Sequence, residues 1–146
     1  YTQEGLAIYS EYCSGSLTIE RLQIIALRVI AVQYMLEHGD FVKTYYSLLN
    51  EFSLDKQTAF TLTTRVYRGG GFTKDYLYLR GFVDVLNLAK QESIDNLLVG
   101  KTGLLDFDMT NEMVDRQLIA RPAALFELAY KPSGDPVLDF VVNSLK

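Results

Sequence analysis

The sequence has few of the residues on which several classes of site depend: among 146 residues there is no Trp, one Cys and one His. A single cysteine, Cys13, excludes an internal disulfide and fits a reducing compartment, so we expect a cytoplasmic protein. The one histidine, His38, is distant in sequence from Cys13 and lies beside Gly39 at an expected helix end. This spacing disfavours a Cys–His catalytic pair, and we interpret Cys13 as a small buried hydrophobic residue.

Positive charge and long apolar runs are also scarce. The chain has 14 Lys and Arg against 18 Asp and Glu, a net charge of −4. Because phosphate binding needs a basic face, this balance argues against a nucleic-acid partner. The longest apolar run, residues 24–35, is interrupted by Arg28 and Gln33 and is too short to cross a bilayer, so we expect no membrane partner.

The apolar residues that are present recur mainly at helical spacing. The sequence therefore predicts an all-α fold of seven or eight helices in an orthogonal or irregular bundle, and its length predicts a single domain over residues 1–146. The longest helix is expected within Leu17–His38, with Gly39 in the left-handed capping position. Residues 103–109 are a possible short extended piece. Further helices are expected over residues 1–12, 41–52, from Ser53 or Asp55 to the glycines at 69–71, and over 74–91, 94–99, 110–119, 122–130 and 137–145.

The first candidate site residue is Glu4, in the expected helix over residues 1–12. Gly5 follows it and Ala7 is three residues on. Glycine inside a helix costs about 1 kcal/mol relative to alanine, so Gly5 needs a reason. A carboxylate that reaches a metal from a helix needs that helix to come close to its partner, which small neighbours permit. Glu11, about two turns further on, shares the face of Glu4 and could orient a metal ligand from behind; alternatively, both are solvated carboxylates.

The segment QEGLA at residues 3–7 is similar to the Asn-Glu-Gly-Phe-Ala segment of zinc aminopeptidases. Together with YRGGGFTKDYLYLRG at residues 67–81, it resembles the QEGLA-motif family of predicted zinc metallopeptidases. That family is similar to the tyrosine carboxypeptidases that trim the C-terminal tyrosine of α-tubulin. The resemblance covers at least residues 1–90, and nothing beyond Val99 is distinctive.

The resemblance implies a gluzincin-like zinc site in which Glu4 is the third protein ligand. The family carries a His-Glu motif with a second His upstream of the QEGLA helix, and its Glu is the general base. This sequence departs from that pattern, because it has one His and His38 is in no such motif. We therefore expect a C-terminal fragment of a longer catalytic domain. The fragment itself would be inactive and bind no zinc tightly, whereas the parent protein would hold zinc and act on peptide or protein C-termini.

The segment at residues 65–81, which concentrates cations, phenols and glycines, has a physical interpretation within this resemblance. A carboxypeptidase must bind the terminal carboxylate of its substrate, and arginine does this bidentately. Arg68 and Arg80 are the candidates, with Lys74 as a weaker one, and Tyr67 could donate a hydrogen bond to the oxyanion. We expect these residues to lie on the same side of the domain as Glu4, as one wall of a cleft. Alternatively, the glycines are a plain helix stop and the arginines are solvated.

A second hypothesis is a non-catalytic helical binding or regulatory module. A His-Glu…His motif upstream of Glu4 would support the enzyme, and its absence would support the module. The pair Asp106 and Asp108 could indicate paired carboxylates, but their spacing of two is more typical of a short strand or a helix entry.

Overall fold

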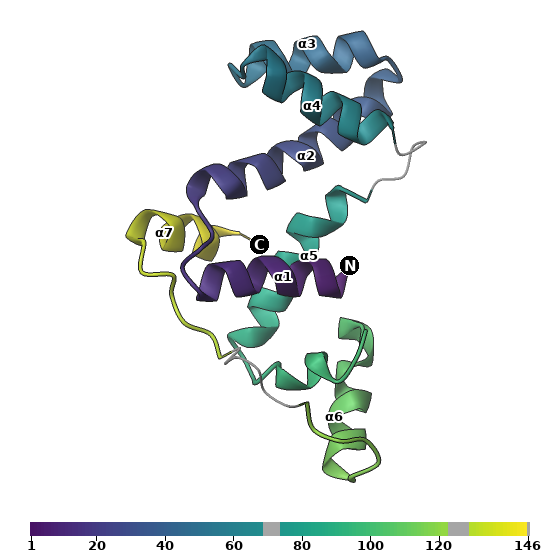
Figure 1. Cartoon of the computed structure of the whole chain (residues 1–146), viewed down its shortest axis with the longest axis vertical. Coiled ribbons are helices and arrows are strands. Elements are labelled where there is room, and N and C mark those ends of the chain that lie inside the picture. Colours follow the sequence, from purple (N-terminus) through teal and green to yellow (C-terminus); the bar gives the residue numbers. More distant parts are fainter. Residues whose placement is uncertain (69–73, 123–128, 146) are drawn as a thin grey trace. The chain divides into compact units, whose positions relative to one another are not determined.

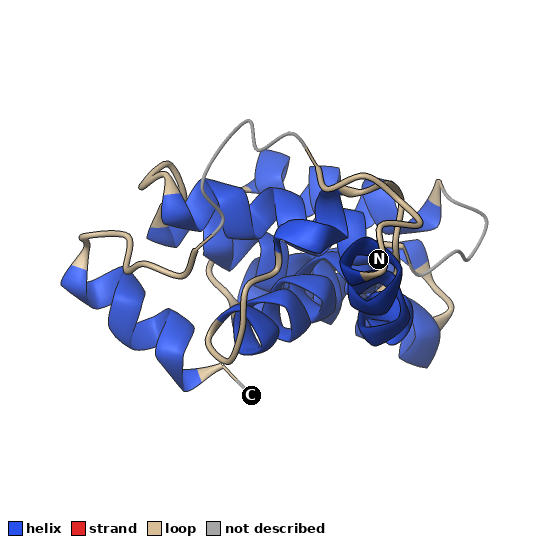
Figure 2. Ribbon diagram, turned by 90° about the horizontal axis from the view of Figure 1, so that it is seen from below, coloured by secondary structure: helices blue, strands red, loops and turns tan. Residues whose placement is uncertain are grey.

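The computed structural model describes residues 1–68, 74–122 and 129–145, and over these ranges it is built from helices without any strand (Figures 1 and 2). The prediction of an all-α fold is confirmed. The elements, in order, are α1 (Thr2–Cys13), α2 (Ile19–His38), α3 (Phe41–Glu51), α4 (Lys56–Tyr67), α5 (Tyr76–Ala89), the 3-10 helices η1 (Asp95–Leu98) and η2 (Leu104–Asp106), α6 (Phe107–Asp115) and α7 (Pro136–Ser144).

The chain divides into two compact units, which we describe separately. The central unit is residues 20–79, and the terminal unit is residues 1–19 together with residues 80–146. The expectations of a single domain and of a particular bundle arrangement stay predictions. No helix among the described residues combines the length and the apolarity needed to cross a bilayer.

The central unit contains α2, α3 and α4, whose starts and stops follow local side-chain chemistry. The longest helix ends at His38, and Gly39 has a φ of 60°, as predicted for a left-handed cap. Asp40 and Asp55 then cap α3 and α4, because their carboxylates accept backbone N–H bonds from the first helical turns. A shared core holds the three helices together through buried side chains: Leu27, Ala31, Val32, Met35, Leu48, Ala59, Leu62 and Val66.

The terminal unit is organised around tyrosines of α1. Tyr9 and Tyr12 are fully buried, and the Tyr12 ring packs edge-to-face on Phe82 of α5 with the ring centroids 6.2 Å apart. The Tyr12 hydroxyl donates a 2.7 Å hydrogen bond to Oδ1 of Asp139 on α7. The same oxygen accepts bonds from the N–H and the hydroxyl of Ser133. One carboxylate thus connects α7, the preceding loop and the middle of the unit.

The structure corrects the expectations between residues 103 and 119. The possible extended piece at 103–109 is wrong, since residues 104–106 form η2 and Phe107 begins α6. The pair Asp106 and Asp108 therefore lies at a helix entry. The expected helix over 110–119 is wrong at both ends, because α6 ends at Asp115. The chain leaves α6 through Gln117, whose φ of 58° is left-handed. The N–H of Gln117 donates to the carbonyl of Val114, and the N–H of Leu118 donates to the carbonyl of Met113.

The other helix boundaries differ less from the expected ones. α5 begins at residue 76 rather than 74 and ends at residue 89 rather than 91. The expected segment over 94–99 is the 3-10 helix η1, and the last helix covers residues 136–144. The expected helix over residues 122–130 lies mainly outside the described residues, as do the glycines at 69–71.

Candidate functional site

In the terminal unit, α1 and α5 approach each other through two glycines, Gly5 and Gly81. Both glycines are buried. A Cβ added to Gly5 would lie 2.2 Å from both the carbonyl carbon and the carbonyl oxygen of Gly81, and one added to Gly81 would lie 2.7 Å from the carbonyl oxygen of Tyr1. These distances leave no room for any side chain, so the backbones are in direct contact. The expectation that Gly5 permits a close approach is confirmed. Its partner is the glycine that ends the second segment of the family resemblance.

This crossing fixes where two predicted site residues lie. Glu4 immediately precedes Gly5 on α1, and Arg80 immediately precedes Gly81 on α5. Since consecutive Cα atoms are about 3.8 Å apart, each residue lies next to the crossing point. Glu4 is half-buried, as is Glu11 further along α1, and both make interactions within the structure.

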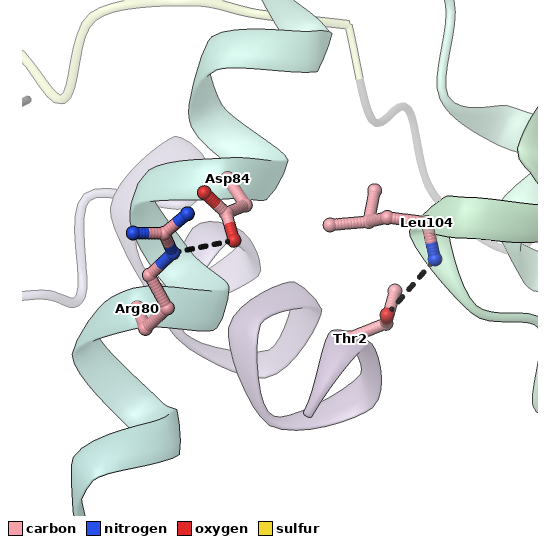
Figure 3. A network of polar contacts seen from close by, with 4 residues as sticks. All are labelled: Thr2, Arg80, Asp84 and Leu104. Carbon is pink, nitrogen blue, oxygen red and sulfur yellow. Dashed lines mark hydrogen bonds and ion pairs between the residues drawn. The ribbon is translucent and has the colours of Figure 1, made fainter.

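Polar contacts surround the same crossing (Figure 3). Nε of Arg80 donates a 2.9 Å hydrogen bond to Oδ2 of Asp84 one turn later, in an ion pair whose side chains are 60% and 24% exposed. On the other side of α1, the hydroxyl of Thr2 accepts a 3.1 Å bond from the backbone N–H of Leu104. Asp84 thus holds the Arg80 guanidinium along α5, and Thr2 holds the start of η2 against α1.

The remaining predicted residues belong to the central unit. Tyr67 ends α4, where its hydroxyl lies 3.0 Å from that of the buried Thr44 and its ring packs edge-to-face on Phe41. Arg68 is exposed and caps α4. Lys74 is also exposed, with Nζ 5.9 Å from the centre of the Tyr78 ring. Because the structure places Glu4 and Arg80 in one unit and Tyr67, Arg68 and Lys74 in the other, the expectation that they share one cleft wall stays a prediction.

An arginine cluster in the central unit was not singled out from the sequence. We define it as Arg28 of α2, Arg65 of α4, Asp75 just before α5, and Tyr78 in the first turn of α5. Nε of Arg65 donates a 2.7 Å hydrogen bond to Oδ1 of Asp75, and these side chains are 30% and 10% exposed. The guanidinium carbon of Arg28 lies 5.8 Å from the centre of the Tyr78 ring, a cation–π contact.

The charges of the arginine cluster act on one another. Burial lowers the pKa of the Arg28 guanidinium, and the like charges of Arg65 and Arg21 lower it further, while Asp75 opposes the shift. The hydrogen bond to Asp75 raises the pKa of Arg65. Three members of the cluster are in the segment 65–81 that the sequence had marked as basic. The fourth, Arg28, interrupts the apolar run of residues 24–35, and this interruption was the one signal for it.

No group of three or more His, Cys, Asp or Glu side chains placed to hold a metal occurs in residues 1–68, 74–122 and 129–145. Among the predicted site residues, Glu4, the predicted metal ligand, has a side chain that can supply a carboxylate oxygen to a metal. A hydrolytic zinc site needs three protein ligands. The part of the chain that the structure describes therefore fits a contribution of one ligand, Glu4, to such a site.

Comparison with models of protein families gives a match over the whole chain. The family model described as microtubule-associated tyrosine carboxypeptidase matches residues 1–146, which extends past the residues 1–90 that carried the resemblance. No curated protein and no solved structure matches the chain.

Proposed function

The chain belongs to the microtubule-associated tyrosine carboxypeptidase family, and from this membership we propose that the protein containing it is a zinc-dependent carboxypeptidase. Its proposed substrate is the C-terminus of a peptide or protein, from which it removes an aromatic residue. The observation that supports a common site is the contact of Gly5 with Gly81. It brings together the two segments on which the resemblance rests and places Glu4 and Arg80 beside one crossing.

Glu4 is the proposed metal ligand of this chain. It lies on a helix whose neighbouring glycine lets another backbone approach directly, as a helix-borne ligand requires. The remaining metal ligands would come from parts of the full-length protein other than residues 1–146. A bound zinc ion would supply a water molecule of lowered pKa. Glu11, on the same helix, is proposed to orient a neighbouring ligand, and residues 1–146 alone are proposed to hydrolyse nothing.

Arg80 is the proposed partner of the substrate's terminal carboxylate. Its guanidinium is held from the Nε side by Asp84, which fixes the plane in which the other donors point. A guanidinium of fixed orientation gives up less conformational freedom when it binds a carboxylate. We further propose that Arg68 and Lys74 contact the substrate and that Tyr67 donates a hydrogen bond to the oxyanion. The proposed site of action is the cytoplasm.

The first test measures metal in the full-length protein. Glu4→Gln keeps the shape of the side chain but removes its charge, so zinc content by elemental analysis should fall from about one equivalent to well below half. Glu92→Gln, which removes an exposed carboxylate elsewhere in the terminal unit, is the matched control and should retain zinc. Unchanged zinc in Glu4→Gln would contradict the ligand assignment.

The second test measures substrate recognition. Arg80→Ala should raise KM about tenfold or more for a peptide ending in a free carboxylate, because a charge-assisted bidentate contact is lost. Cleavage of the same peptide with an amidated end, already a poor substrate, should change little. If the wild-type protein cleaves neither peptide and holds no zinc, the enzyme assignment fails, and the non-catalytic helical module becomes the better interpretation.

A further inference from the structure

We infer that the central unit contains a binding site for an oxyanion, a carboxylate or phosphate group, formed by Arg28 and Arg65 beside the ring of Tyr78. The inference is independent of the proposed carboxypeptidase function, because it uses residues of the central unit alone.

The first observation is an unsatisfied donor. Nε of Arg28 is buried and has no hydrogen-bond partner among residues 1–68, 74–122 and 129–145. Leaving a buried donor without a partner destabilises the folded state, and more so when the donor is charged, so such atoms are rare in folded proteins. Arginine has no acceptor, and the other cations of the cluster have none either. The acceptors of the cluster are the carboxylate of Asp75 and the hydroxyl of Tyr78, and neither accepts a bond from this Nε, so the position is open to an acceptor from outside the cluster.

The second observation is a charge imbalance. Within the cluster, the guanidinium groups of Arg28 and Arg65 share a single carboxylate, that of Asp75. That carboxylate is already bound by Nε of Arg65 at 2.7 Å. A water molecule could accept a bond from Arg28 but would leave the excess positive charge in place. An anion supplies the acceptor and the charge together.

The third observation is that the arginines are held in place. The cation–π contact with Tyr78 positions Arg28, and the hydrogen bond to Asp75 positions Arg65. Planar guanidinium groups of fixed orientation match the paired oxygens of carboxylates and phosphates. The same geometry serves either source of the oxyanion, and the two are separated by experiment.

The test is a titration of the ¹⁵N-labelled full-length protein, followed by NMR at the arginine Nε–Hε resonances. Sodium phosphate and sodium acetate are added separately at constant ionic strength, with sodium chloride as the balancing salt. We expect a saturable shift of the Arg28 and Arg65 resonances. In Arg28→Met, the remaining shift at Arg65 should report binding weakened about tenfold or more. The matched control is Arg116→Met, which removes an exposed arginine paired with Glu112 in the terminal unit and should titrate like the wild type.

Saturation by acetate, with or without phosphate, assigns a carboxylate ligand, and saturation by phosphate alone assigns a phosphate ligand. Shifts that do not saturate with either anion, or that persist unchanged in Arg28→Met, overturn the proposal. If Arg28→Met does not fold, Arg28→Lys takes its place, because it keeps the charge but loses the planar fork. Undiminished binding in Arg28→Lys would then overturn the role of the Arg28 guanidinium.

Discussion

The terminal and central units bring their helices together by opposite means. In the terminal unit, α1 and α5 meet through Gly5 and Gly81, with backbone against backbone and no side chain between them. In the central unit, α2, α4 and the start of α5 are connected by the long side chains of the arginine cluster. A contact made of glycines has no room for an added atom. A contact made of arginine side chains can adjust to an added atom, but it depends on the carboxylate of Asp75, which compensates the charges of Arg28 and Arg65.

Each unit contains an Arg–Asp pair in which the arginine Nε donates to the carboxylate, and these two pairs differ in exposure. Arg65–Asp75 in the central unit is mostly shielded from water, whereas Arg80–Asp84 in the terminal unit lies largely at the surface. Because solvent screens an exposed pair, the two should contribute differently to stability. The pairs therefore allow the contrast between the units to be measured with the same chemistry.

The largest effect is expected for Gly5→Ala. The new Cβ would meet backbone atoms of Gly81 at 2.2 Å, and a backbone cannot rotate away as a side chain can. We expect a loss of about 3 kcal/mol in the free energy of unfolding, after allowing for the gain of about 1 kcal/mol in helix propensity. Urea denaturation measures this. Gly100→Ala is the control, since no atom lies within 4 Å of the added Cβ, and it should be nearly neutral.

Gly81→Ala sharpens the same test. Its Cβ would meet the carbonyl oxygen of Tyr1 at 2.7 Å and atoms of Gly5 at 3.2 Å, a milder overlap than the reverse substitution makes. It should destabilise the protein by less than Gly5→Ala does. Equal stability of both variants and the wild type would show that the two helices are not in direct contact.

The next effect is expected for Asp75→Asn. Removing this carboxylate leaves Arg65 and Arg28 without their compensating charge in a partly buried place, and we expect a loss of about 2 kcal/mol. Asp84→Asn removes the acid of the exposed pair and should cost less than about 0.5 kcal/mol. Denaturation of both variants under the same buffer and salt gives the comparison directly. Similar losses in the two variants would contradict the difference between the units.

The smallest effect concerns acid stability in the terminal unit. Burial pushes the pKa of Asp139 up, but hydrogen bonds from Tyr12 and Ser133 outweigh it and hold the pKa below its usual range. A lowered folded-state pKa gives stability that is present above the unfolded-state value of about 3.9 and is lost as pH falls through the folded-state value. Tyr12→Phe removes one of these bonds. The denaturation midpoint of this variant should therefore fall less steeply than that of the wild type between about pH 5 and pH 3, a range that brackets the unfolded-state pKa of Asp139.

Tyr46→Phe is the control for this change, because Tyr46 is exposed on α3. Its acid dependence should match the wild type. An unchanged slope in Tyr12→Phe would show that the Tyr12–Asp139 bond contributes nothing to acid stability.

Local sequence was sufficient where one residue sets the backbone. Gly39 predicted the end of α2 and Asp40 the start of α3, and of the two expected starts for α4, Ser53 and Asp55, the structure has Asp55, because caps act within a single turn. The end of α6 was not predicted, because its cap lacks a residue that is typical of helix ends. Its left-handed capping position is occupied by Gln117, a residue type that carries no signal for that conformation.

For the candidate site, the sequence determined that Gly5 must serve a close approach, since glycine inside a helix is otherwise unfavourable. It also marked residues 65–81 as a segment of cations and glycines. Only the tertiary structure decided that the partner of Gly5 is Gly81, and that Arg28 joins Arg65, Asp75 and Tyr78. The physical reason is distance along the chain: Gly5 and Gly81 are 76 positions apart and Arg28 and Tyr78 are 50 apart, so nothing local to either partner specifies the other.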